Sequence, residues 1–330
     1  MKNNPFFIEY NQPFNTLPFN EFKTEHFLPA IHEAIKISNA KLGNICNNDK
    51  EASFENTILE LEMSHEDLGR IVGVYWHLFG ADSEGDFKKL AQEISPIISS
   101  HTNDYMLNAE LFKRIKKVYD NRSNMNYDEH DSKLIEDTHQ AFIRNGASLS
   151  DSDKELLRGL DKELSLLSPR FSNNVLDAQN SFEMWVTDKN DLEGLPEDAI
   201  NAAAESATKK NKENHWLFTL QMASYLPFMT YSKKRHLREY LFKGYGGLCN
   251  EGKYDNSDIV KKIVKLKHKR AQLLGYKSHA DFVLERRMAE NIENVYGLLD
   301  NLYEYSYKAA KSELDELKKY AMSIDGLDSF

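Results

Sequence analysis

Two histidine–glutamate pairs are the residues with the clearest potential for hydrolytic metal chemistry. They are His32-Glu33 and His65-Glu66. A zinc site on a helix needs a second histidine four residues after the first, so that both imidazoles face one metal, while the adjacent glutamate acts as general base. The residues at that spacing are Lys36 and Gly69. Neither pair completes the H-E-x-x-H motif, which occurs nowhere in the 330 residues.

The spacing of the other histidines does not favour a metal site either. His130 and His139 are nine residues apart, which places them on opposite faces of one helix. His26 and His32 are six residues apart and also diverge. His65 falls on the apolar stripe of its predicted helix, where a partly buried, hydrogen-bonded core histidine is the more common situation. The sequence therefore predicts no metal-binding residue in this chain.

Signatures of other active sites are missing from the sequence as well. Cys46 and Cys249 are too isolated for a disulfide framework or a cysteine-based metal site, and no G-x-S-x-G elbow occurs. GYGG at Gly244–Gly247 lacks both G-x-G-x-x-G and a P-loop lysine, which favours a loop. The basic run Lys261–Arg270 is typical of a solvated helix face, the alternative being a surface that attracts peptide carboxylates. We predict no catalytic and no cofactor-binding residue in the chain.

Helical periodicity dominates, because apolar residues return every three or four positions in most segments. The clearest case is one long amphipathic helix over residues 54–79, with Ser53 as its N-cap and a break at Gly80–Asp86. A second run over residues 87–119 is expected to be interrupted near Pro96, and a later helix to break or kink at Pro169, since proline lacks the N–H that a helix interior needs.

Turn and cap residues delimit the remaining helices. Asn121–Asp128 is predicted as a turn, Asn145-Gly146 as a left-handed helix end, and Ser152 with Glu155 as a capping box. Further helices are predicted over residues 197–209, 231–245 (after Pro227), 258–274, 279–287 and 291–321. Only the short aromatic segments Phe182–Val186 and Trp216–Leu220 favour strands. The predicted fold class is therefore all-α with one small two-stranded β element, with an N-terminal helical region over residues 1–150 and a helical region that contains the β element over residues 151–330.

Composition narrows the function classes. The net charge of −10 argues against nucleic acid as the main partner, because phosphate binding needs clustered positive charge. The N-terminus lacks the apolar core of a signal peptide, and the longest apolar stretch, Ile71–Ala81, is too short for a membrane span. We expect no membrane partner and a cytoplasmic location.

Three stretches carry a family resemblance: FSNNVLDA at Phe171–Ala178, SYLPFMTY at Ser224–Tyr231, and the run from YDNSD at Tyr254–Asp258 through LLGYKSHADF to RMAEN, ending at Asn291. They resemble the non-catalytic half of the zinc oligopeptidase family that includes oligopeptidase A, peptidyl-dipeptidase and thimet oligopeptidase. The middle segments are more similar to oligopeptidase A, whereas HTNDYMLNAELF at His101–Phe112 and HQAFIRNGA at His139–Ala147 are more similar to peptidyl-dipeptidase, so both branches of the family stay open. The resemblance extends from Asn4 to Phe330 and is strongest from about Phe171 to Asn291.

The resemblance implies a mostly helical, two-lobed metallopeptidase whose deep channel admits short peptides and whose zinc lies on the channel floor. No zinc ligand of that family matches a position in this chain. The resemblance implies that this chain is an N-terminal portion that forms most of one lobe and a channel wall. Its implied partner is a C-terminal catalytic half that carries the zinc, and the chain is expected to be inactive alone. Two alternatives remain open: a stand-alone helical peptide-binding module, and a regulatory or structural partner of a separate catalytic chain, which would expose a large apolar face.

Overall fold

The computed structural model describes residues 4–81 and 85–326, together with the side chains of all of these except residues 85, 86 and 325. It confirms the all-α prediction, since helices make up most of the chain and one two-stranded antiparallel sheet accompanies them. Contacts between Cα atoms divide the chain into two compact units, Met1–Leu266 and Lys267–Phe330. The predicted boundary near residue 150 lies inside unit 1, and the division of the chain at that point remains a prediction.

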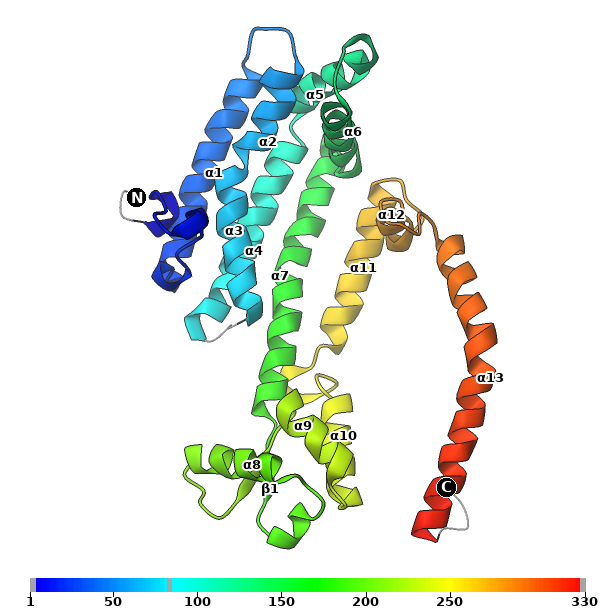
Figure 1. Cartoon of the computed structure of the whole chain (residues 1–330). Coiled ribbons are helices and arrows are strands. Elements are labelled where there is room, and N and C mark those ends of the chain that lie inside the picture. The colour runs from blue at the N-terminus through cyan, green and yellow to red at the C-terminus, as the bar shows by residue number, and fades with distance from the viewer. Residues whose placement is uncertain (1–3, 82–84, 327–330) are drawn as a thin grey trace. The chain divides into compact units, whose positions relative to one another are not determined.

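Three helices build the first hydrophobic core of unit 1. They are α1 (Thr24–Cys46), α3 (Glu66–Ala81) and α4 (Gly85–Met106), which lie side by side in Figure 1. Each contributes buried residues three or four positions apart, such as Phe27 and Ile31 from α1 and Ile71 and Tyr75 from α3. The N-terminal residues Pro5–Phe7, Pro13–Asn15 and Phe19–Glu21 form short 3-10 turns, and Phe6 inserts into this core.

A second core lies at the C-terminal end of α1. It is enclosed by a π-helical segment (Phe54–Leu59), α2 (Glu60–Ser64), α5 (Ala109–Asn121) and α6 (Glu129–Arg144). The turn predicted between α5 and α6 is confirmed, with a 3-10 segment at Arg122–Asn124. Gly146 follows α6 with a φ of 92°, which confirms the predicted left-handed helix end.

The single helix predicted over residues 54–79 is wrong in one respect. Ser53 caps it as predicted, because its Oγ accepts a hydrogen bond from the Asn56 N–H at 3.3 Å. The chain then leaves helical geometry at His65, with φ −107° and ψ 2°, so α2 and α3 are separate helices. The apolar stripe continues across the break, and sequence periodicity therefore gives no sign of it. The break predicted at Gly80–Asp86 includes residues 82–84, which lie outside the described residues.

The interruption predicted at Pro96 and the break predicted at Pro169 are also wrong, while the kink given as the alternative at Pro169 stays a prediction. Helix α4 continues through Pro96, and α7 (Asp151–Ser181) continues through Pro169. These two helices pack along each other, and Pro169 is buried, so tertiary packing offsets the lost backbone hydrogen bond. Helix α7 also begins earlier than predicted: Ser150, and not Ser152, is its N-cap, accepting from the Asp153 N–H at 3.2 Å.

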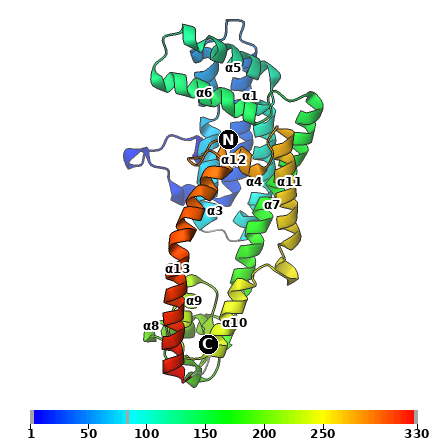
Figure 2. The same cartoon turned by 90° about the vertical axis from the view of Figure 1, so that its right-hand side faces the viewer.

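A small subdomain follows α7 in unit 1 (Figure 1, Figure 2). The predicted strands are confirmed in shorter form as β1 (Met184–Val186) and β2 (Trp216–Phe218), paired antiparallel with Trp185 opposite Leu217. Around them lie a 3-10 turn (Lys189–Leu192), α8 (Glu197–Lys209), α9 (Met222–Tyr231) and α10 (Arg235–Gly246). Helix α9 contains Pro227, so helical structure resumes before this proline and not after it. The predicted glycine loop begins only at Gly247, because Gly244 and Gly246 belong to α10.

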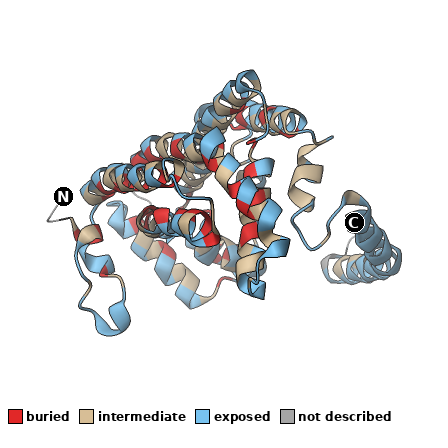
Figure 3. Cartoon of the chain, turned by 90° about the horizontal axis from the view of Figure 1, so that it is seen from above, coloured by how far each residue is buried: buried red, intermediate tan, exposed pale blue. Residues whose placement is uncertain are grey.

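A 3-10 turn (Gly252–Tyr254) leads into α11 (Ser257–Leu273), within which unit 1 ends. Unit 2 contains the end of α11, α12 (His279–Leu284) and the long α13 (Ile292–Asp325). Buried residues concentrate in the helices of unit 1, while α13 is exposed almost throughout (Figure 3). In the parts of the chain that the structure describes, no helix combines the length and apolar character needed to cross a bilayer.

Candidate functional site

Two of the three family-like stretches meet on the second half of α7. The Asn174 Nδ2 donates to the Asn256 Oδ1 at 2.8 Å, and the Asn256 Nδ2 donates to the Phe171 carbonyl oxygen at 3.1 Å. Asn256 is only 3% exposed, so both bonds are made away from bulk water, where an unpaired amide would be costly. The start of α11 is thereby fastened to α7 through side chains that are 82 residues apart in sequence.

Lys88 of α4 adds a third element to this arrangement. Its Nζ lies 2.5 Å from the Asp177 Oδ1 and donates to the Asn173 carbonyl oxygen at 3.2 Å. The Lys88 side chain is 14% exposed, so its charge is partly desolvated and compensated by this carboxylate. We call Lys88, Asn173, Asn174, Asp177 and Asn256 the α7 junction. The sequence marked its Asn and Asp members through FSNNVLDA and YDNSD, but no sequence signal pointed to Lys88.

The third stretch, SYLPFMTY, approaches the end of the same helix. The Gln179 Nε2 donates to the Leu220 carbonyl oxygen at 3.1 Å, and the Gln221 Nε2 donates to the Asn180 Oδ1 at 2.7 Å. The Ser224 Oγ then accepts from the Thr219 N–H at 3.0 Å, which fixes the entry into α9. Sequence-distant stretches with family resemblance are therefore joined along one helix of unit 1.

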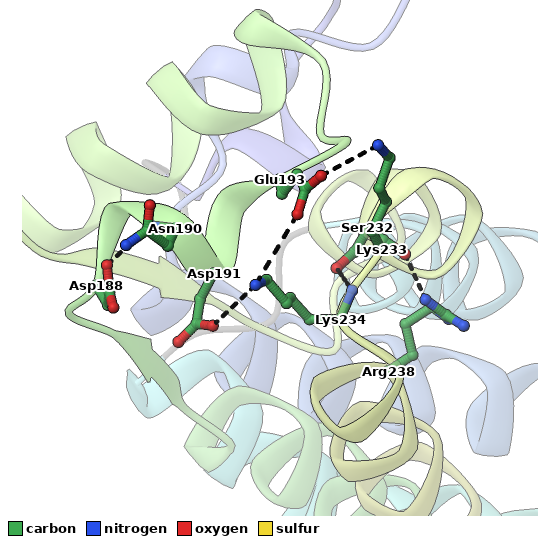
Figure 4. A network of polar contacts seen from close by, with 8 residues as sticks. All are labelled: Asp188, Asn190, Asp191, Glu193, Ser232, Lys233, Lys234 and Arg238. Atoms are coloured by element: carbon green, nitrogen blue, oxygen red, sulfur yellow. Dashed lines mark hydrogen bonds and ion pairs between the residues drawn. The ribbon is translucent and has the colours of Figure 1, made fainter.

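A separate polar network holds the small subdomain together (Figure 4). The Glu193 carboxylate accepts from the Lys233 Nζ at 3.1 Å, and this hydrogen bond lowers the pKa of Glu193. Lys234 lies between Asp191 and Glu193 at 3.9 and 4.0 Å. The side chain of Arg238 donates to the Ser232 carbonyl oxygen. These contacts tie the segment after β1 to the connection between α9 and α10.

His65 and His101 form a pair of buried and half-buried histidines. Their ring centroids are 5.7 Å apart, and the Tyr105 ring centroid lies 4.3 Å from that of His65. The His65 Nδ1 is 2.7 Å from the Ser64 Oγ, which confirms the prediction of a partly buried, hydrogen-bonded core histidine. Burial lowers the pKa of both histidines, and for His101 the neighbouring His65 lowers the pKa further. Both shifts favour the neutral imidazoles.

The remaining candidate groups are dispersed. The His26 Nδ1 accepts from the Lys23 N–H at 3.1 Å, His32 and His130 are exposed, and His139 stacks on Tyr119. Within residues 4–81 and 85–326, no group of three or more histidine, cysteine, aspartate or glutamate side chains could hold a metal ion. The prediction that any zinc ligands lie outside this chain stays a prediction.

The two cysteines are poorly suited to nucleophilic chemistry. Burial raises the pKa of Cys46 and of Cys249, which disfavours the reactive thiolate. The α7 junction offers amides and one lysine–carboxylate pair, groups that position elements and can hydrogen-bond a ligand. Its geometry is that of a structural seam and not of a hydrolytic centre.

Known proteins are similar in sequence to this chain over most of its length. The model of peptidase family M3 matches residues 228–330. The dipeptidyl carboxypeptidase of Escherichia coli K12 is 30% identical over 318 residues, covering 96% of this chain and 46% of the relative. Oligopeptidase A of Haemophilus influenzae is 31% identical, with 92% and 45% covered, and a probable cytosolic oligopeptidase A of Arabidopsis thaliana is 28% identical, with 97% and 46% covered.

The chain thus spans about half the length of the curated relatives that it matches. The similarity covers nearly all of the chain and does not stop at the segments that carried the resemblance. The chain belongs to peptidase family M3, and it corresponds to the N-terminal part of its relatives.

Proposed function

We propose that this chain is the N-terminal portion of a zinc metallopeptidase of the oligopeptidase A or dipeptidyl carboxypeptidase type, which hydrolyses short peptides. The observation that supports this most strongly is the similarity over more than nine tenths of the chain to peptidases that are about twice as long. In this proposal the zinc and its ligands belong to the C-terminal half, and unit 1 supplies a wall of the peptide channel.

A wall needs rigidity more than reactive groups, because it selects substrates by the shape of the space that it leaves. The α7 junction supports such a role, since it fixes α4, α7 and the start of α11 to one another through polar contacts. We place the whole protein in the cytoplasm, as the name of the Arabidopsis relative states for that protein.

The test is a chimera in which residues 1–330 are followed by the part of the E. coli dipeptidyl carboxypeptidase that this chain does not match. We expect the chimera to bind one zinc ion and to cleave a short fluorogenic peptide, with both lost after chelation. A folded, zinc-loaded chimera without peptide cleavage would contradict the proposed wall, whereas an isolated chain that takes up peptide tightly without any catalytic half would favour the stand-alone binding module.

A further inference from the structure

The longest helix of the chain, α13, is well defined at both ends. The Asn291 Oδ1 accepts from the Asn294 N–H at 2.8 Å at its start, and Gly326, with a φ of 64°, terminates it. Such caps specify where a helix begins and ends, but an amphipathic helix gains most of its stability by packing its apolar face. The surface that the apolar face of α13 packs against therefore decides how stable this helix is.

Apolar side chains follow one side of α13 at intervals of one, three or four residues, with one gap of seven between Tyr303 and Ala310. In chain order, this stripe consists of Ile292, Val295, Tyr296, Leu299, Leu302, Tyr303, Ala310, Leu314, Leu317, Tyr320, Ala321 and Ile324. At 100° per residue they fall within about 60° of one line on the helix surface. The opposite side is polar and carries residues such as Asp300, Glu304, Lys308, Lys311 and Lys319.

This stripe is exposed. Leu299 is 51% exposed, Leu302 55% and Leu317 65%, and every residue from 296 to 317 is in the exposed class (Figure 3). The half-buried members of the stripe are Ile292 and Val295 at the N-terminal end, where α12 contacts the helix, and Ala321 near the C-terminal end. An uncovered apolar stripe of this length is unusual for a soluble protein and marks an interaction surface.

The lengths of the relatives indicate what covers it. The M3 family match continues to the last residue of the chain, and more than half of each relative lies outside the region of similarity. We propose that the apolar stripe of α13 is the docking surface for the C-terminal portion of an M3 peptidase, which lays an apolar helical or sheet face along it. This inference rests on the proposed function and adds the specific surface by which the two portions join.

The test uses the 330-residue chain and, as a separate polypeptide, the C-terminal portion of the E. coli dipeptidyl carboxypeptidase. Amide hydrogen exchange is measured over residues 292–325 before and after mixing, together with the affinity of the pair. In the isolated monomer we expect fast exchange over residues 296–317, and on mixing at least a tenfold slowing with 1:1 association. The double variant L299Q/L317Q should weaken association at least tenfold, while the matched polar-face variant N301Q/S312Q should stay within twofold of the wild type.

Three results would overturn the proposal. These are slow exchange of α13 in the monomeric chain alone, slowing that depends on self-association of the chain, and failure of the two portions to associate or to distinguish the two double variants. This readout does not involve cleavage, so it can contradict the α13 surface without contradicting the proposed function. If the chimera cleaves peptide but the L299Q/L317Q variant associates as tightly as the wild type, the α13 surface is contradicted and the peptidase proposal stands.

Discussion

At the residue scale, the side chains that resemble a peptidase family serve here as connectors. Asn174 and Asn256 share a hydrogen bond across two helices, and Asp177 compensates the partly buried charge of Lys88. Amides are suited to such seams because they donate and accept at once, so that one side chain can join two backbone segments.

Replacing Asn256 by alanine tests the α7 junction. The variant loses two hydrogen bonds and leaves the Phe171 carbonyl and the Asn174 amide without their partner. We expect the free energy of unfolding to fall by about 2–3 kcal/mol, measured by urea denaturation at pH 7. Asn301→Ala on the exposed side of α13 is the control and should change it by less than about 0.5 kcal/mol. Equal effects of the two substitutions would show that the junction does not stabilise unit 1.

The buried histidines predict a loss of stability in acid. Burial lowers the pKa of His65 and His101 in the folded chain, so the unfolded chain binds protons first. Their stabilising contribution is complete above the unfolded pKa of about 6.5 and is lost as the pH falls through that value, at up to about 1.4 kcal/mol per histidine and pH unit. Urea denaturation at pH 7.5 and 5.5 measures this loss.

The double variant H65Q/H101Q removes both titrating groups and should lose clearly less stability between the two pH values than the wild-type chain does. If the wild-type chain and the double variant respond identically to acid, the two rings are not buried as the structure describes.

At the element scale, the periodicity and capping residues in the sequence predicted most helices. Helix α8 has the predicted bounds, Glu197–Lys209, and α13 begins after Asn291 as predicted. The errors concern the prolines, the break at His65, the N-cap of α7 and the start of the glycine loop. Pro96, Pro169 and Pro227 lie inside helices. The sequence shows only the local penalty of a proline in a helix, and packing between helices outweighs this penalty. At the break, His65 contacts the rings of His101 and Tyr105 from α4, and a local pattern does not contain such contacts.

The candidate site was less predictable than the helices. FSNNVLDA and YDNSD could be singled out, but their meeting through Asn174 and Asn256 follows from how α7 and α11 pack. The participation of Lys88 follows from the packing of α4 on α7, which brings together residues 89 positions apart. The spacing of residues within one segment does not predict contacts between segments that are distant in the sequence.

Gly194 tests the connection between the small sheet and α10. Its φ is 92°, and a Cβ at this position would lie 2.3 Å from the Tyr231 carbonyl oxygen. Gly252 has a similar φ of 77°, but a Cβ there would meet no heavy atom within 4 Å. Alanine at Gly252 therefore measures the cost of the backbone strain alone, whereas alanine at Gly194 adds the clash. We expect Gly252→Ala to cost about 1 kcal/mol and Gly194→Ala to cost clearly more, by urea denaturation. Equal costs would show that the subdomain tolerates a shift at Tyr231.

At the scale of the whole molecule, the chain is mostly helical, is similar in sequence to M3 peptidases over about half of their length, and combines the α7 junction with a long helix that exposes an apolar stripe. On the proposed function, a channel wall built by unit 1 and an α13 surface that receives the catalytic portion explain why the chain is similar to peptidases and yet lacks the paired histidines of the zinc motif.

The measurement that tests this account most directly is zinc content and peptide cleavage of the purified 330-residue chain after incubation with excess zinc. We predict well below one zinc ion per chain by elemental analysis, and cleavage of a fluorogenic oligopeptide no faster than in the buffer control. One tightly held zinc ion per chain, with cleavage that disappears on chelation and returns with the metal, would contradict the claim that catalysis requires the other half.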